Sequence, residues 1–463
     1  MDHTFTRRDF FRSLGAAAAA LLVSVVLGSC ATVDPQPEWQ KLAALSKERA
    51  PAELIWQQSD TDAQVVRDKV QELLADGLSR QDAVQVALLN SPELQADFEE
   101  LGVARANLVQ AGLFTNPSLS VFIGFPINLA DSSVGLTALL SDLWTVPARE
   151  KIFSSRAEGT VQRVAAAVVD TAADTSDAYD EAVYRLESLH LEHRVLEVRK
   201  QASAQTQTRY DKGLANDLDV VRAQSEVFDQ ELSVGRAELE LARARAHLDQ
   251  ALALPETHAD YRITDKLEVP PPSEWTVEAA IPFALDHRLD LAFRRIEVER
   301  RERELALERR EVLGPVGIGP GYEGAFGQED VWGPLVGLSL PIFDQNQAQI
   351  AKAEYRLRQA RLQLAATELQ ARTDVKNALA TLEFRRKQVD TIHHRLEPLR
   401  ARAVEYTERW SSGMHLTFLD LLHARAQEIT IHREHLQALW EMRRTQVRLQ
   451  RALWGASEND DPD

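Results

Sequence analysis

Apolar residues recur at helical spacing along two very long stretches of the chain, where they are sparse and lie among charged neighbours. The stretch from Arg149 to Tyr210 has no proline and one glycine, and that from Gln345 to Trp410 has no glycine and one proline. At 1.5 Å per residue, such helices would span roughly 90–100 Å. Narrow apolar stripes are typical of coiled-coil packing. The pattern therefore predicts two very long helices that pack against other long helices.

Ahead of each long stretch, apolar and polar residues alternate instead, which indicates β-strands. The alternating segments are SLSVFIGF (118–125) and VGLTALL (134–140) in the first half, and VGIGPGYEGAF (316–326) and PLVGLSLPIF (334–343) in the second. Turn-forming residues separate the members of the first pair, in the sequence NLADSS. We therefore expect each half of the chain to form one β-hairpin.

The chain contains two copies of one unit. Gly213, in RYDKGLANDLDVV, and Gly413, in RWSSGMHLTFLDLL, each lie at a predicted turn between two helices. The similar segments VGLTALL and VGLSLPI begin at Val134 and Val336, which are nearly as far apart in the sequence as the two glycines. Because the landmarks keep their order, each copy is predicted to contain a helix, a hairpin, a long helix, a turn and a helix. The first helix of the first copy is predicted over 80–113.

This repeat divides the chain into six parts. In order, they are a leader (1–29), an N-terminal tether (30–78), a first repeat (79–254), a linker (255–275), a second repeat (276–454) and an acidic tail (455–463). The tether is polar and is expected to be partly extended. Three consecutive prolines exclude a helix from that part of the linker, and the tail is expected to be disordered.

The leader resembles a twin-arginine export signal joined to a lipoprotein cleavage site. Paired Arg7 and Arg8 precede an apolar run over 16–27, and the sequence LGSC ends at Cys30. The run is shorter than the roughly 20 residues that a membrane-spanning helix needs. Cys30 is the only cysteine, so no intramolecular disulfide can form, and its position predicts a covalent lipid. Because Ala31 follows it rather than aspartate, we expect residence in the outer membrane.

The composition excludes several classes of function. The formal net charge is −18, and loss of the leader, which carries +1, would leave −19. A surface this acidic argues against nucleic acid as a partner. The sequence contains no Walker loop, dinucleotide fingerprint or nucleophile elbow. We therefore expect no enzymatic activity, and no cofactor apart from the lipid on Cys30.

The predicted strands raise the question of how the sheet is completed. Four strands alone would leave open edges with a continuous apolar face, whereas three copies of the chain would supply twelve strands. The segments are short beside the roughly 9–11 residues of a membrane-spanning strand. A soluble hairpin cap is the alternative.

The ordered set of motifs resembles the TolC-like outer-membrane efflux factors. The segments that carry the resemblance are AGLFTNPSLSVFIGF, YDKGLANDLDVVRAQ and VGLSLPIFDQNQAQIAKAEYRLRQA, and it extends from about Leu73 to Trp454. It implies a mainly α fold with a small β part. In that fold a long α-helical coiled-coil barrel joins a transmembrane β-barrel of twelve strands, four from each subunit of a homotrimer. It further implies contact with outer-membrane lipid in a Gram-negative bacterium, extension into the periplasm, a periplasmic adaptor protein and, indirectly, an inner-membrane pump.

The resemblance also assigns two groups of residues. The turns would be tips that dock with the adaptor, formed by Gly213, Leu214 and Ala215 and by Gly413, Met414 and His415. Acidic residues inside the tips would narrow a closed aperture, namely Asp219 with Arg222 and Asp420 with His423, each pair one helical turn apart. Asp219 is the sixth residue after Gly213, but Asp420 is the seventh after Gly413. The alternatives are ordinary glycine helix caps at the turns and solvated helix charges at the aperture.

Histidines recur at short spacing on the predicted helices, as His190 with His193, His393 with His394, and His432 with His435. Such pairs occur in zinc and copper sites. A site also needs third and fourth ligands, and no cluster of cysteine or methionine accompanies these pairs. The sequence therefore predicts solvated surface histidines and no metal site.

The sequence is compatible with more than one class of transported substrate. The segment GLSLPIFDQNQAQI is similar to the end of the second hairpin in the heavy-metal efflux branch, which favours metal cations. Drugs are the main alternative, and a type I secretion duct for polypeptides is a third. A non-conducting periplasmic scaffold lipoprotein is the alternative from another class, although a scaffold has no need of alternating apolar hairpins.

Overall fold

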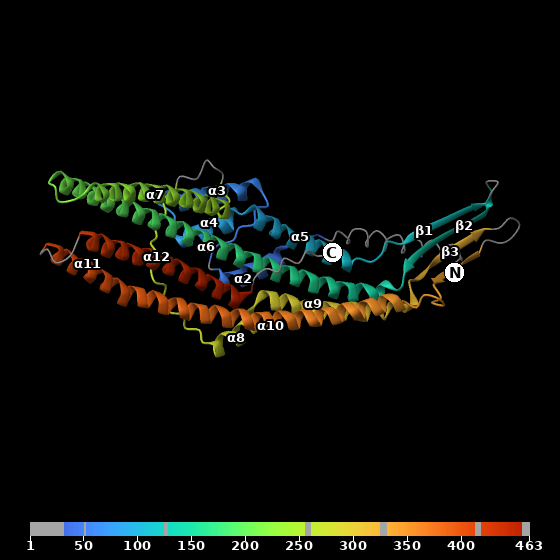
Figure 1. The fold of residues 1–463 in the computed structure, drawn as a ribbon. Coiled ribbons are helices and arrows are strands. Elements are labelled where there is room, and N and C mark those ends of the chain that lie inside the picture. The colour runs from blue at the N-terminus through green and yellow to red at the C-terminus, as the bar shows by residue number, and fades with distance from the viewer. Residues whose placement is uncertain are drawn as a thin grey trace, which may run out of the picture.

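A computed structural model describes residues 32–50, 52–124, 128–254, 261–324, 331–412 and 418–455. In it, helices run side by side along a narrow body and a small sheet lies at one end (Figure 1). This confirms the mainly α fold with a small β part. The predicted sites at Cys30, Gly413, Met414 and His415 lie outside the described residues.

The first half forms the succession of elements that the pattern predicts, with one break. Helix α4 (Arg80–Asn90) is followed by α5 (Pro92–Gly112), strands β1 (Ser118–Gly124) and β2 (Asn128–Leu139), α6 (Asp142–Asp211) and α7 (Asp217–Ala251). The prediction of one helix over 80–113 was wrong. Ser91 is extended and caps α5, and Pro92 occupies its first turn, where proline is tolerated.

The second half repeats this succession. It comprises α8 (Val277–His287), α9 (Leu289–Glu308), the 3₁₀ turn η2 (Glu311–Leu313), β3 (Val316–Gly324), β4 (Val331–Leu338), α10 (Gln347–Thr391), the π-helical turn η3 (Ile392–Leu396), α11 (Glu397–Ser412) and α12 (Phe418–Trp454). The long stretch predicted over 345–410 therefore changes its hydrogen-bonding pattern at η3. One extra residue in that turn shifts the faces of α11 relative to α10.

The four strands form one antiparallel sheet in the order β1-β2-β3-β4. Two predicted boundaries were wrong. The turn predicted at NLADSS belongs entirely to β2, which begins at Asn128 and has 12 residues. The last strand begins at Val331 and ends at Leu338, because it follows the register of β3 from Glu323 to Val316.

The N-terminal segment is helical and packed apart mainly from residues 32–35 and 52–59, so it contains more helix than the prediction of a partly extended tether describes. Helices α2 (Gln36–Arg49) and α3 (Asp60–Ala75) lie along the body. Leu42 and Val66 are buried. The Trp56 indole donates a hydrogen bond to Glu99 at 2.8 Å. Buried apolar side chains and paired polar groups together dock α2 on α5 and α6 and α3 on α4.

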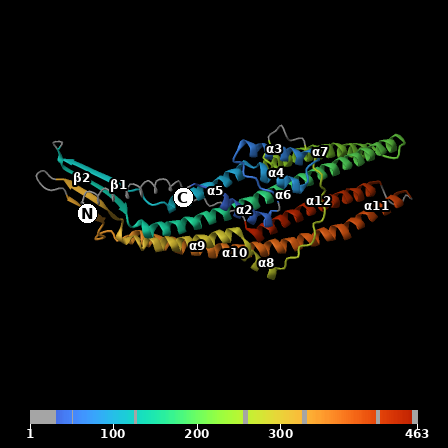
Figure 2. The ribbon, with the colours of Figure 1, turned by 180° about the vertical axis from the view of Figure 1, so that it is seen from behind.

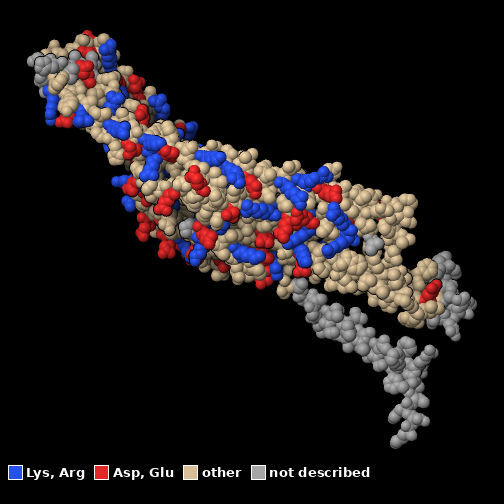
Figure 3. Space-filling model, turned by 90° about the horizontal axis from the view of Figure 1, so that it is seen from below, with Lys and Arg blue, Asp and Glu red and all other residues tan. Residues whose placement is uncertain are grey.

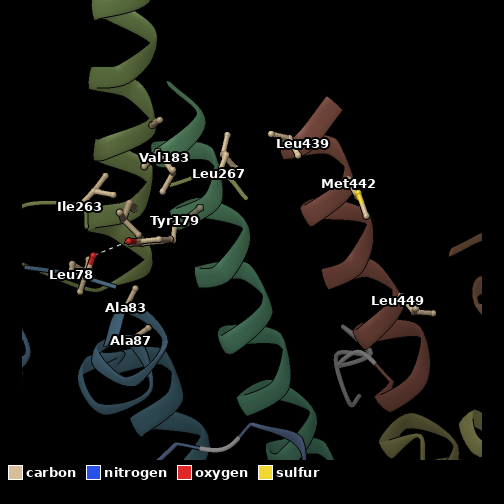
Figure 4. Close-up of a cluster of buried hydrophobic side chains, with 14 of the residues drawn as sticks. Leu78, Ala83, Ala87, Tyr179, Val183, Ile263, Leu267, Leu439, Met442 and Leu449 are labelled. Carbon is tan, nitrogen blue, oxygen red and sulfur yellow. Dashed lines mark hydrogen bonds between the residues drawn. The ribbon is translucent and has the colours of Figure 1, made fainter. Parts of the chain in front are cut away.

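The largest core cluster joins the two halves in the middle of the molecule. Figure 4 shows Tyr179 of α6 with its ring among Leu78, Ile263 and Val183, while Leu439, Met442 and Leu449 line α12. The Tyr179 hydroxyl donates to the Leu78 carbonyl at 2.8 Å. Leu78 and Ile263 also form a parallel bridge. Buried tyrosines need such a partner, so the chain ahead of the first repeat and the linker are tied to the same point of α6.

Within the described parts of the chain, no helix combines the length and apolar character needed to cross a membrane.

One carboxylate in this middle region predicts a pH-dependent stability. Burial raises the pKa of Asp177 from its ordinary value of 3.8 to about 6, although Arg444 and Arg451 oppose the shift. The folded chain therefore holds this proton more tightly than the unfolded chain. The free energy of unfolding therefore falls as pH rises from about 4 to about 6. Above pH 6 the folded protein bears the full cost of burying the ionised Asp177 carboxylate.

We expect Asp177→Asn to remove this cost and to raise the free energy of unfolding at pH 7.5 by about 3 kcal/mol. Thermal unfolding of the detergent-purified protein at pH 5 and pH 7.5 measures it. The gain in melting temperature over wild type should be larger at pH 7.5. An equal gain at both values would contradict the assignment to Asp177.

Candidate functional site

The two ends of the molecule differ in chemistry. The four-stranded sheet occupies one end, and the turn between α6 and α7 lies at the other together with the C-terminal end of α11 and the N-terminal end of α12, as both views show (Figures 1 and 2). Lysine, arginine, aspartate and glutamate cover the helical body on the face drawn in Figure 3, whereas the sheet shows few of them. The chain therefore presents an apolar end and a charged, solvated shaft.

One face of the sheet is apolar, and small and polar residues predominate on the other, which also carries Phe122, Val331 and Leu335. A row across all four strands on the apolar face consists of Val121, Val134, Tyr322 and Trp332. The neighbouring row on the opposite face consists of Ser120, Gly135, Gly321 and Gly333. Trp332 is 73% exposed, and its ring lies 4.9 Å from that of Tyr322. Alternation of this kind, with aromatic residues on the apolar face, is typical of strands that face lipid on one side.

The glycines of β3 allow a close approach to β2. A Cβ atom on Gly319 would lie 1.6 Å from the carbonyl oxygen of Leu136. The neighbouring Pro320 has no N–H to donate to the ladder, so β2 and β3 lack regular pairing at this point. Their backbones nevertheless approach closely. The run of glycines therefore has a steric function within the sheet.

The first tip is a glycine-capped turn with apolar residues at its surface. Gly213 has a φ of +72°, and its N–H donates to the Tyr210 carbonyl at 2.8 Å. The Leu214 N–H donates to the Arg209 carbonyl at the same distance. Leu214 is 66% exposed, and Ala215 is half-buried. This geometry closes the C-terminus of α6 and leaves one leucine on the outside.

The aperture residues have local partners. The Asp219 carboxylate accepts a hydrogen bond from the Asn216 N–H at 3.2 Å, and the Asn216 side chain accepts from the Asp219 N–H at 3.0 Å. This reciprocal pair is a capping box at the start of α7. Arg222 is exposed on the next turn. Asp219 thus has a structural function in addition to any effect on permeating ions.

In the second repeat, His423 contacts a neighbour on its own helix. Its Nε2 lies 2.8 Å from the Gln427 amide nitrogen, and Arg400 of α11 donates to the other end of the same amide. Asp420 is exposed in the first turn of α12. The predicted pairs at the aperture therefore lie at corresponding ends of α7 and α12, in different local surroundings.

Comparison with known proteins decides the family. Residues 83–254 match the model of the outer membrane efflux protein family. Nodulation protein T of Rhizobium leguminosarum is 25% identical over 96% of this chain and 93% of its own length. The matched residues place 83–254 in this family, and together the comparisons support a TolC-like outer-membrane efflux factor.

Solved structures show that this efflux factor shares their fold. The outer membrane protein VceC of Vibrio cholerae superposes with a TM-score of 0.68 at 17% identity, covering 82% of this chain and 97% of VceC. The open state of the MtrE outer membrane channel of Neisseria gonorrhoeae gives a TM-score of 0.65 at 20% identity, covering 82% and 90%. The family match and the shared fold support an outer-membrane channel protein that extends into the periplasm, and members of this family are channels, not enzymes.

The structure of this efflux factor also brings together residues that sequence reasoning had set aside. His393 from η3 and His432 and His435 from α12 surround Glu397, the first residue of α11. Glu397 was not singled out because a glutamate on a charged helix is common. The available signal was His393 and Glu397 at i,i+4, which places them on one helical face.

Proposed function

We propose that three copies of the chain assemble into a duct that passively conducts substrates from the periplasm to the exterior. The open edges of the sheet support this most directly. Among the described strands, β1 and β4 each pair on one side only, and their apolar side chains are exposed. Three sheets of four strands would satisfy both edges and would place the small, polar face toward the lumen.

The duct is tested by conductance of the purified protein in planar bilayers. A trimer with stepwise conductance is the expected result. A monomer, or a trimer without conductance, would favour the periplasmic scaffold instead.

We propose that the tips dock with a periplasmic adaptor protein, which connects the duct to an inner-membrane pump. Exposed Leu214 on a tight, glycine-closed turn supports this, because a rigid apolar knob costs little entropy on binding. The second tip would use Gly413, Met414 and His415.

Leu214→Asp is expected to abolish most export while the bilayer conductance of the purified protein stays unchanged, because the charge would be buried against the adaptor. Growth of a complemented deletion strain on its toxic substrate measures export. Lys212→Asp, an exposed change on the same turn, is the matched control. Equal export by wild type and Leu214→Asp would contradict docking at this tip.

We propose that Asp219 and Asp420, with Arg222 and His423, form the narrowest part of the closed duct. Three carboxylates of each kind around a threefold axis would favour cations. The variant Asp219→Ala with Asp420→Ala should lower the cation preference of the bilayer conductance.

The capping box supplies the control for this prediction. Asn216→Ala breaks the same cap, at a cost of about 1 kcal/mol, but retains the Asp219 charge. It should leave ion selectivity unchanged. If both variants altered selectivity alike, the effect would come from the helix end and the aperture assignment would be wrong.

We propose that the leader directs export of the chain by the twin-arginine route. A lipid on Cys30 then anchors the exported protein in the outer membrane. The sequence LGSC and the packed helices α2 and α3 that follow support this, because they place the anchor close to the body. Cys30→Ser should abolish metabolic labelling with palmitate, and Arg7→Lys with Arg8→Lys should stop export.

We propose heavy-metal cations as the cargo, on the resemblance of the segment from Gly337 to Ile350. Growth inhibition of a deletion strain across copper, zinc, cobalt, silver and a panel of drugs tests it. Metal sensitivity restored by the intact gene is expected. Broad drug sensitivity with unchanged metal tolerance would assign the chain to multidrug efflux.

A further inference from the structure

Three histidines converge on one carboxylate where α10 passes into α11. The His393 Nδ1 lies 3.0 Å from one oxygen of Glu397. The Nδ1 atoms of His432 and His435 lie 3.3 Å and 2.6 Å from the other oxygen. The ligand atoms of His393, Glu397 and His435 all lie within 4.8 Å of one another. Imidazole nitrogen and carboxylate oxygen are the ligands found in zinc sites.

The local backbone explains why these side chains meet. His393 lies in the π-helical turn η3, and Glu397 begins α11 one turn later. His432 and His435 are i,i+3 on α12, which packs against η3 and α11. A π-helical turn rotates the following residues relative to a regular helix, and such turns are frequent at functional sites. The set therefore combines His393 of η3 and Glu397 of α11 with two histidines of α12.

The inner half of the cluster is more buried than a solvated surface pair, whereas the side chains of His393 and His432 are 52% and 48% exposed. The side chains of Glu397 and His435 are each 17% exposed. Within the described residues, the His435 Nε2 atom is buried without a hydrogen-bond partner. His432 and His435 also line a groove together with His190 of α6, which gives access from solvent. An imidazole with one ring nitrogen on a carboxylate and the other unpaired has not satisfied its polar groups.

The neighbouring contacts hold the cluster in place. Arg433, between the two histidines of α12, donates two hydrogen bonds of 2.6 Å to Glu192 of α6. Gln230 of α7 bonds to the same glutamate at 2.6 Å. The histidine face of α12 is thus oriented from the opposite side, so the ligands are largely preorganised.

We propose that His393, Glu397, His432 and His435 bind a divalent cation of the zinc class, which links α11 to α12. The three imidazoles and the carboxylate would supply four ligands in a tetrahedral arrangement. The cation would join α11 to α12 in the second hairpin. At the corresponding level of the first hairpin, the hydrogen bond between Glu192 and Gln230 joins α6 to α7 instead. The site is separate from the proposed cargo and needs no transport, so its test does not depend on the proposed function.

The test uses the full-length protein, purified in detergent and stripped with chelator. Titration with Co²⁺ should give the intense visible absorption of a tetrahedral site, and titration with Zn²⁺ should show one ion per chain by calorimetry. His393→Ala with His435→Ala should weaken Zn²⁺ binding by roughly tenfold or more. His394→Ala is the matched control, because His394 is adjacent but lies 3.7 Å from Asp390 instead.

Equal Zn²⁺ affinity in wild type and the double variant would overturn the proposal, as would an equal loss in His394→Ala. If the double variant does not assemble, Glu397→Gln serves in its place. Zn²⁺ should then raise the melting temperature of wild type and leave that of Glu397→Gln unchanged. An equal rise in both would reject the site.

Discussion

Gly319→Ala is expected to prevent correct assembly of the sheet. The added methyl group would lie 1.6 Å from the Leu136 carbonyl oxygen and 2.7 Å from its carbonyl carbon. Both atoms are backbone, so β2 and β3 must separate. Overpacking typically costs about 1–3 kcal/mol and occasionally more, and a contact this short places the change at or above that upper end.

The measurement is the amount of folded trimer recovered from outer membranes, by gel mobility without heating. Gly337→Ala on β4 is the matched control, because a Cβ there meets nothing within 4 Å. We expect Gly337→Ala to assemble like wild type and Gly319→Ala to be nearly absent. Normal recovery of Gly319→Ala would mean that the close approach of β2 and β3 does not occur in the membrane.

Asp180→Ala is expected to cause the second large loss, in the middle of the helical body. The Asp180 side chain is 1% exposed, and its carboxylate lies 3.0 Å from Arg443 of α12 and 3.3 Å from Arg80 of α4. Arg443 also donates to the carbonyls of Lys266 and Glu268 in the linker. One carboxylate thus joins both repeats and the segment between them.

The cost arises mainly from the arginines that remain. Burial raises the pKa of Asp180 although both arginines oppose this, so the interaction itself adds little net stability. Without the carboxylate, Arg443, whose side chain is 16% exposed, would lack its counter-charge. Removing one member of such a buried pair costs about 3–5 kcal/mol. Because Arg80 is more exposed, we expect the lower end of this range.

Asp174→Ala is the matched control for this prediction. Asp174 lies on the same helix and also pairs with an arginine of α12, Arg451, but its side chain is 67% exposed. Exposed pairs contribute about 0–1 kcal/mol. Thermal unfolding in detergent should therefore show a large drop in melting temperature for Asp180→Ala and little change for Asp174→Ala. Similar drops in both would show that burial at Asp180 is not the cause.

Helix type, strand type and the twofold repetition were predictable from the sequence because their signals are local. A period of two over 118–124 and the absence of proline from 149–210 need no knowledge of neighbours. The break at Ser91 was also present locally, as a capping residue followed by proline. The apolar periodicity on either side of it favours one continuous helix instead.

Contacts between distant residues could not be predicted in this way. Whether α2 and α3 pack depends on complementary surfaces on α4, α5 and α6, and the sequence of residues 32–78 by itself does not reveal those surfaces. The Asp180–Arg443 pair joins residues 263 positions apart. Neither charge differs in sequence from the many solvated charges around it, so only burial distinguishes it.

The histidines show most clearly which features the sequence determines and which depend on packing. Composition and spacing established that the chain has paired histidines on polar helices, and the lack of further ligands nearby in sequence argued against a metal site. The π-helical turn then brings His393 and Glu397 against two histidines of α12. The sequence determined which ligand types exist and on which helices they lie. Only the packing of α11 against α12 decided that four of them meet, because a coordination site is defined by distances in space.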